Sequence, residues 1–210
     1  MTTAKICGLS TPETLDAALR HGASHVGFMI YPPSPRYVTF DRLRGLATQV
    51  PTHVERVGVF VDPDETLVEA AVAAGRLDVL QLHKTSPERA AAIRTRTGRK
   101  VWATVAVKTR ADLTGAHGFT QAADLILYDA KTPDGGLPGG MGVRFDWGLL
   151  DGHRHPLPWA LSGGLDAANV GEAIRRTRAA IVDVSSGVEH EPGVKDVDKI
   201  GMFLRAVADA

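Results

Sequence analysis

Two side chains able to exchange protons stand at the ends of predicted strands. Cys7 ends a strand expected over Ala4–Cys7, and Asp129 comes directly after the apolar run Leu125–Tyr128. A thiolate can remove a proton and a protonated carboxyl can donate one, so the two groups together suit a proton-shuttling isomerisation. Each has an ordinary alternative, since most free cysteines are small buried hydrophobes and an aspartate in this position can cap the following segment.

Two glycine-containing turns near the end of the sequence indicate a phosphate site. Their candidate binding residues are Gly163, Gly164, Ser185, Ser186 and Gly187, and each turn follows a short apolar run. A helix is expected to begin at once after the first turn, and backbone amides near a helix N-terminus favour phosphate. Ordinary strand-to-helix turns also favour glycine and serine, but the pair in this order favours a sugar-phosphate ligand.

A third glycine cluster occupies residues 135–142. Its Gly139, Gly140 and Gly142 could also present backbone amides to a phosphate, although the cluster could equally be a flexible segment. The whole loop from Ala130 to Arg144 has the length of an active-site loop.

Three further polar residues stand near predicted strand ends. Arg36 lies in a segment stiffened by Pro32 and Pro33, and its planar fork suits a carboxylate, unless it is a solvated loop residue. His83 ends the fourth strand, where it is either a polar group satisfied by its neighbours or a site residue. Asp183 lies inside the eighth strand and is predicted to be a paired structural acid.

Short apolar runs alternate with segments of helical periodicity along the whole sequence. The expected strands are Ala4–Cys7, His25–Ile30, Val54–Phe60, Asp78–Leu82, Val101–Val107, Leu125–Tyr128, Pro158–Leu161 and Ile181–Val184. The expected helices are Thr11–His21, Phe40–Gln49, Asp64–Ala74, Pro87–Thr97, Thr109–Thr120, a short one near Phe145–Leu150, Asp166–Thr177 and Val197–Val207. Capping hydroxyls before Pro12 and Pro87 mark the starts of two of these helices, and Gly22 and Gly75 mark the ends of two.

Eight strand–helix units with near-continuous apolar strands predict an α/β fold, a single (β/α)8 TIM barrel over residues 1–210. Its active site is expected at the C-terminal ends of the strands. The alternative is an open doubly wound sheet, which a glycine fingerprint after the first strand would support. The segment Cys7–Ser10 does not match that fingerprint.

Composition limits the partners. Lys plus Arg equals Asp plus Glu at 24 each, so no global field attracts nucleic acid or an anionic membrane. The single cysteine fits a reducing compartment, and no apolar run is long enough to span a membrane, so a soluble cytoplasmic protein is expected. The eight histidines are scattered, and neither a metal nor a cofactor is predicted.

Motifs along residues 5 to about 200 resemble those of the phosphoribosylanthranilate isomerase family. They are Lys5–Gly8, Gly27–Phe28, Ser34–Val38, Gln81–His83, Gly139–Gly142, Phe145–Trp147, Ser162–Leu165, Val182–Glu189 and Pro192–Asp196. The resemblance implies a (β/α)8 barrel that catalyses an Amadori rearrangement in tryptophan biosynthesis without cofactor or metal.

The resemblance also implies roles for individual residues. Asp129 would be the general acid that protonates the ribose ring oxygen, and Cys7 the general base that removes the C2 proton. Arg36 would hold the anthranilate carboxylate. The backbone of the Gly140–Gly142, Gly163–Gly164 and Ser185–Gly187 regions would hold the phosphate.

Two residues depart from the family pattern, and three other protein classes fit the sequence less well. Lys84 stands where the family usually has glycine, and Ala103 where a lysine is common, which puts the fine shape of the site in question. Indole-glycerol-phosphate synthase needs a lysine and glutamate set that cannot be placed, and the histidine-pathway isomerase needs an acid at the position of Cys7. A non-catalytic sugar-phosphate-binding protein would lack Cys7 or Asp129. A small-molecule substrate is expected, and the chain is predicted to be a monomer or a homodimer.

Overall fold

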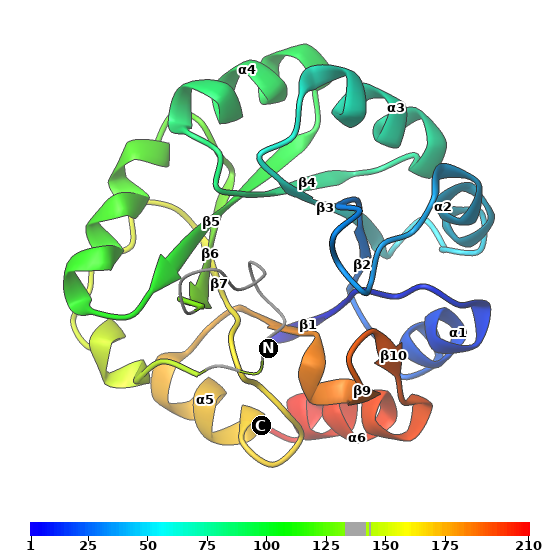
Figure 1. Cartoon of the computed structure of the whole chain (residues 1–210). Helices are drawn as coiled ribbons and strands as arrows, with labels where there is room; N and C mark the ends of the chain where they lie inside the picture. The colour runs from blue at the N-terminus through cyan, green and yellow to red at the C-terminus, as the bar shows by residue number, and fades with distance from the viewer. Residues whose placement is uncertain (133–141, 143) are drawn as a thin grey trace.

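The computed structural model describes residues 1–132, 142 and 144–210, which fold around a closed barrel of parallel strands (Figure 1). The barrel strands are β1 (Thr3–Cys7), β2 (His25–Met29), β3 (Glu55–Val61), β4 (Val79–His83), β5 (Lys100–Val107), β6 (Leu125–Ala130), β7 (Trp159–Leu161) and β8 (Ile181–Val184). Each strand pairs with the one before it, and β8 closes the barrel by pairing with β1. Closure confirms the predicted (β/α)8 fold and excludes the doubly wound alternative.

Helices surround the barrel on its outside (Figure 1). The α-helices are α1 (Pro12–Arg20), α2 (Phe40–Ala47), α3 (Glu65–Gly75), α4 (Pro87–Thr97), α5 (Val170–Thr177) and α6 (Val197–Ala208), and the 3-10 helices are η1 (Arg110–Phe119), η2 (Trp147–Leu150) and η3 (Ser186–Val188). None of the helices in the described part of the chain is long and apolar enough to cross a membrane. Because all eight strands run parallel, their carboxyl ends meet on one face, which is where the predicted site residues stand.

The two helix starts that were predicted from capping hydroxyls are correct, whereas one predicted helix stop is wrong. Thr11 caps α1 by accepting from the Thr14 amide, and Ser86 caps α4 in the same way. The stop expected at Gly75 lies one residue further on, because Arg76 adopts the left-handed conformation (φ 45°) and Gly75 belongs to α3. A β-carbon at Gly75 would press against Leu77 and Leu43, so this glycine serves packing rather than the turn.

Three regions differ from the sequence prediction. The helix expected over Thr109–Thr120 is the 3-10 helix η1, whose sequence contains two glycines that weaken an α-helix. The helix expected from Asp166 starts only at Val170, because the Asp166 carboxylate accepts from the amides of residues 168 and 169 and forms a turn. An antiparallel hairpin of β9 (Glu189–Glu191) and β10 (Val194–Lys195) follows β8 and was not predicted.

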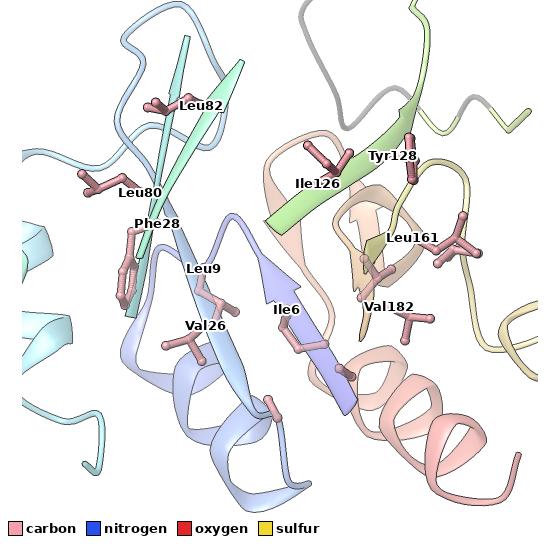
Figure 2. Packing of buried hydrophobic residues seen from close by; sticks show 14 of the residues in the cluster. Ile6, Leu9, Val26, Phe28, Leu80, Leu82, Ile126, Tyr128, Leu161 and Val182 are labelled. Carbon is pink, nitrogen blue, oxygen red and sulfur yellow. The ribbon is translucent and has the colours of Figure 1, made fainter. Parts of the chain in front are cut away.

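Buried apolar side chains form two layers. The larger layer fills the space between strands and helices, and Figure 2 shows part of it, including Ile6, Leu9, Val26, Phe28, Leu80, Leu82, Ile126, Tyr128, Leu161 and Val182. A smaller cluster, which contains Cys7, Met29 and Trp102, packs separately inside the barrel. Side chains alternate along a strand, so on β1 the outward Ala4 and Ile6 leave Lys5 and Cys7 facing the barrel interior.

Candidate active site

Cys7 lies at the carboxyl end of β1, as predicted, with its side chain buried. Burial raises the pKa of the Cys7 thiol, and the Lys5 ammonium opposes that effect. The Ser185 hydroxyl donates a hydrogen bond of 3.2 Å to the Cys7 carbonyl, which ties the end of β1 to the turn after β8. The chain therefore presents a buried thiol whose ionisation depends on the charges beside it.

Asp129 lies on β6, which extends one residue beyond it to Ala130. Its Oδ1 accepts from the Ala130 amide at 2.9 Å. Burial and, after it, the negative charge of Asp183 raise the pKa of Asp129 to about 7. A carboxyl with that pKa holds its proton in a large fraction of molecules at neutral pH and is suited to general acid catalysis.

Two buried charges that sequence reasoning did not place in the site lie inside the barrel. Lys5 Nζ donates to Asp183 Oδ1 at 2.8 Å, and Asp183 Oδ2 accepts from the Ser162 hydroxyl at 3.3 Å. The prediction that Asp183 is a paired acid is thus confirmed. Burial alone would lower the pKa of Lys5, but attraction to Asp183 and Cys7 raises it above its usual value, so Lys5 is a cation.

Arg36 is buried and not solvated, and its guanidinium makes a two-point contact with the carboxylate of Glu189 in the hairpin after β8. Its Nε and Nη2 donate to the two oxygens of Glu189 at 2.8 and 2.7 Å. Lys195 Nζ donates to Glu189 Oε1 at 2.6 Å and to the Ser185 backbone oxygen at 3.0 Å. Hydrogen bonds from Arg36 and attraction to Lys195 outweigh the effect of burial, so the pKa of Glu189 lies below its usual value.

His83 ends β4 as predicted and lies beside Gln81, the next residue on the same face of that strand. Burial, assisted by the charges of Lys5 and Lys84, lowers the pKa of His83 to about 4, so the ring is neutral at pH 7. The Gln81 and His83 side-chain nitrogens are 3.0 Å apart. Among the described residues, no partner accompanies the buried Oε1 of Gln81, which leaves a polar atom for a ligand.

The glycine turns adjoin one another at the carboxyl ends of the last strands. Gly163 has φ 93°, and a β-carbon there would collide with the Ala130 amide, so only glycine fits beside the end of β6. A β-carbon at Gly187 would meet the carbonyl of Leu165, and one at Gly142 would lie 3.7 Å from the Ser186 hydroxyl. The three segments are therefore neighbours, whereas the predicted Gly139 and Gly140 lie outside the described residues.

The structure brings most of the predicted site residues to one face of the barrel. Cys7, Arg36, His83 and Asp129 lie at or just beyond the carboxyl ends of β1, β2, β4 and β6, and the turns with Gly163, Gly164, Ser185, Ser186 and Gly187 follow β7 and β8. The residues at this face that were not predicted from the sequence are Lys5, Gln81, Glu189 and Lys195. Lys5 had a usable signal, because a lysine inside a strand buried on both faces requires a partner.

The fold and this face define a (β/α)8 barrel with glycine-containing turns after β7 and β8 and with a buried thiol and a buried carboxyl at the carboxyl ends of β1 and β6. The family model described as N-(5'phosphoribosyl)anthranilate (PRA) isomerase matches residues 4–206. The chain therefore belongs to the phosphoribosylanthranilate isomerase family, as its motifs predicted.

Individual relatives agree with this family. The N-(5'-phosphoribosyl)anthranilate isomerase of Zymomonas mobilis subsp. mobilis is 52% identical over 205 residues, which cover 97% of this chain and 96% of that one. A crystal structure of monomers generated from the dimeric phosphoribosylanthranilate isomerase of Thermotoga maritima matches with a TM-score of 0.86 and 35% identity over all of both chains. A crystal structure of a phosphoribosylanthranilate isomerase in complex with reduced 1-(o-carboxyphenylamino)-1-deoxyribulose 5-phosphate matches with a TM-score of 0.87 and 33% sequence identity, again over all of both chains.

Proposed function

We propose that this chain converts N-(5'-phosphoribosyl)anthranilate into 1-(2-carboxyphenylamino)-1-deoxyribulose 5-phosphate, an Amadori rearrangement of tryptophan biosynthesis. Its family membership supports the reaction. The observation that carries the assignment is the buried Asp129, whose pKa of about 7 suits a general acid. It lies at the same face of the barrel as the Cys7 thiol and the glycine turns after β7 and β8.

Asp129 acts first, as general acid. Its proton passes to the ribose ring oxygen while the bond between that oxygen and C1 breaks, and the nitrogen lone pair forms the Schiff base. A carboxyl that ionises near pH 7 can give this proton and regain it at neutral pH, which a carboxyl of ordinary pKa would do far less readily.

Cys7 acts second, as general base. Its thiolate removes the proton from C2, and the electron pair of that bond forms the C1–C2 double bond of an enolamine while the iminium is neutralised. The enolamine then tautomerises to the ketose. The proposal requires the thiolate form, against which burial works and which the nearby Lys5 cation favours.

The remaining site residues bind substrate. The backbone amides around Gly142, Gly163–Gly164 and Ser185–Gly187 hold the phosphate, with Gly140 assigned to the same role from the sequence alone. Arg36 holds the anthranilate carboxylate. Glu189 fixes the plane of the Arg36 guanidinium, since it binds two of its nitrogens.

A neutral His83 completes the substrate pocket beside Gln81. The ring opening and the tautomerisation are driven by general acid and base catalysis, so the proposal includes no metal or cofactor. We assign residues 1–210 to one domain.

The partner is this small-molecule substrate, without nucleic acid or membrane, in keeping with the balanced charge. A homodimer or a monomer is proposed, because the Thermotoga maritima relative is dimeric and has also been crystallised as monomers. The reducing cytoplasm is the proposed location, which suits a base that must remain a free thiol.

Loss of phosphoribosylanthranilate fluorescence after addition of purified protein tests the proposal. Wild-type protein should give rapid decay, and Cys7→Ala should slow it by at least about 100-fold while its circular dichroism and melting temperature stay close to wild type. No decay with folded wild-type protein would refute the isomerase assignment. Rapid decay with Cys7→Ala would remove only Cys7 from its role.

A further inference from the structure

Lys5 and Asp183 are register partners across the β1–β8 seam of the barrel. Their side-chain atoms lie 2.8 Å apart, and the Lys5 side chain is fully buried while that of Asp183 is 5% exposed. Their neighbours Ile6 and Val182, labelled in Figure 2, belong to the outer apolar layer. By alternation, the pair points to the barrel interior, where Cys7 also lies.

The cation of this pair lies beside the Cys7 sulfur. Gly27 is the register partner of Cys7, and a β-carbon on Gly27 would lie 3.1 Å from both Cys7 Sγ and Lys5 Cε. The missing side chain at Gly27 therefore leaves the space in which the lysine stem and the sulfur meet. The other charges that act on the thiol are Asp183 and Lys195.

The anion of the pair faces the side on which Asp129 lies. Asp183 Oδ2 accepts from the Ser162 hydroxyl, and the Ser162 amide donates to the carbonyl of Tyr128, the residue before Asp129. The groups that act on the Asp129 carboxyl are Asp183, Ser162, the Ala130 amide and Lys5. Asp183 therefore repels a negative charge on Asp129, while Lys5 attracts one to Cys7.

We infer that the buried Lys5–Asp183 pair is a positioning device for protons, in which Lys5 favours the thiolate of Cys7 and Asp183 keeps the carboxyl of Asp129 protonated. Lys5 and Asp183 are thus positioning residues and not catalytic ones. The inference rests on the proposed function, because those two forms are the ones the base and the acid need.

Stability alone does not explain the pair. Two charges taken from water into a barrel interior lose their hydration, and a buried ion pair is often no more stabilising than apolar residues of similar volume. The place of this pair, between the two groups that must differ in protonation, gives it a second effect that an apolar pair could not have.

The test uses the fact that Cys7 is the only cysteine of the chain, so the difference in absorbance near 240 nm between a protein and its Cys7→Ala version reports on the Cys7 thiolate, with the ionisation of the three tyrosines subtracted. Lys5→Met should raise the pH midpoint of this titration by about one unit or more. In a plot of kcat/KM against pH, we assign the limb near pH 7 to Asp129. Asp183→Asn should move this limb by about one pH unit to lower pH. Both variants should lower kcat more than they raise KM.

Arg56→Met is the matched control, because it breaks another ion pair, with Asp78, outside the groups that act on Cys7 and Asp129. It should leave both readouts unchanged. If Lys5→Met does not fold, the double variant with Asp183→Asn replaces it and should still raise the thiol midpoint, because Lys5 acts on Cys7 more strongly than Asp183 does.

An unchanged thiol midpoint in the folded Lys5 variant, or an unmoved limb in Asp183→Asn, overturns the inference. The thiol titration needs no substrate. Failure of the isomerase assignment, seen as inactive wild-type protein, is therefore distinguishable from failure of the pair to control the thiol.

Discussion

Two aspartates at opposite ends of the barrel have opposite surroundings. Asp78, just before β4, accepts hydrogen bonds from the Arg56 amide at 2.9 Å and from Arg56 Nε at 2.8 Å. Asp129, near the end of β6, accepts one from the Ala130 amide and lies near the anionic Asp183. The first carboxylate is paired with a cation at the rim, while the second is buried beside a charge of its own sign.

The amino-terminal end repeats the arrangement of Asp78. Asp124, just before β6, accepts from the Val101 amide at 2.8 Å with one oxygen and from Arg94 at 2.7 Å with the other. In both cases an aspartate that precedes one strand holds the start of its neighbour. These carboxylates stabilise the barrel, and none of them needs to change its charge.

The difference between the two ends is visible in the pKa values. Burial raises the pKa of Asp78, but the hydrogen bonds and charge of Arg56 outweigh it and leave the value below normal. Burial and Asp183 leave the pKa of Asp129 at about 7. One barrel therefore uses the same residue type for stability at one end and for an adjustable proton at the other.

The largest expected effect is a difference in kcat between variants of Asp129 and Asp78. Asp129→Asn removes the proposed acid and should lower kcat by about 100-fold to 10,000-fold, while Asp78→Asn should leave kcat within about twofold of wild type. Initial rates of fluorescence decay at saturating substrate measure both variants. Near-wild-type turnover in Asp129→Asn would take the acid role away from that residue.

The framework of strands and helices was accessible from sequence because local signals determine it. The helix Pro87–Thr97 was predicted with the bounds that it has in the structure, from a capping serine and an N-terminal proline. Cys7 and His83 were correctly placed at strand ends, since an apolar run that stops at a polar residue marks its own end.

The contacts that tune the site could not be predicted, because they join distant parts of the chain. Glu189 binds Arg36 from 153 positions away, through a hairpin whose Pro192-Gly193 turn is a local signal that says nothing about this distant partner. The late start of α5 and the 3-10 form of η1 depend on single side-chain hydrogen bonds and on glycines, which weigh little in a periodicity argument. A side chain that hydrogen-bonds to nearby backbone amides can outweigh the helix propensity of the segment.

The next effect concerns stability against pH. The native pKa of Asp129 is raised, so its contribution to stability is complete below the unfolded value near 4 and is lost as pH rises through about 7. Asp129→Asn does not undergo this loss and should gain about 4 kcal/mol relative to wild type between about pH 4 and pH 8. Urea unfolding at the two pH values measures it. A constant difference between variant and wild type would contradict the raised pKa.

A smaller effect compares two arginines. Arg36→Ala should raise KM by about tenfold or more with a lesser change in kcat, because the proposed carboxylate contact is lost. The KM of Arg36→Lys should lie between those of wild type and Arg36→Ala, since an ammonium cannot bind both carboxylate oxygens in one plane. Arg56→Ala, at the other end, should leave KM unchanged. An unchanged KM in folded Arg36→Ala would count against the carboxylate contact.

The smallest effect is the stability contributed by Asp78. Asp78→Asn weakens the charge-assisted bonds to Arg56 and should lower the free energy of unfolding by about 1 kcal/mol at pH 7. The native pKa of Asp78 is depressed, so its contribution is present above the unfolded value near 4 and is lost as pH falls through the native one. The loss of unfolding free energy in Asp78→Asn should thus become smaller as the pH falls below about 4. The gain of unfolding free energy in Asp129→Asn should instead become larger as the pH rises from about 4 to about 8. Urea unfolding from pH 3 to pH 8 compares the two slopes, and slopes of the same sign would mean that the two ends of the barrel do not differ in the way described.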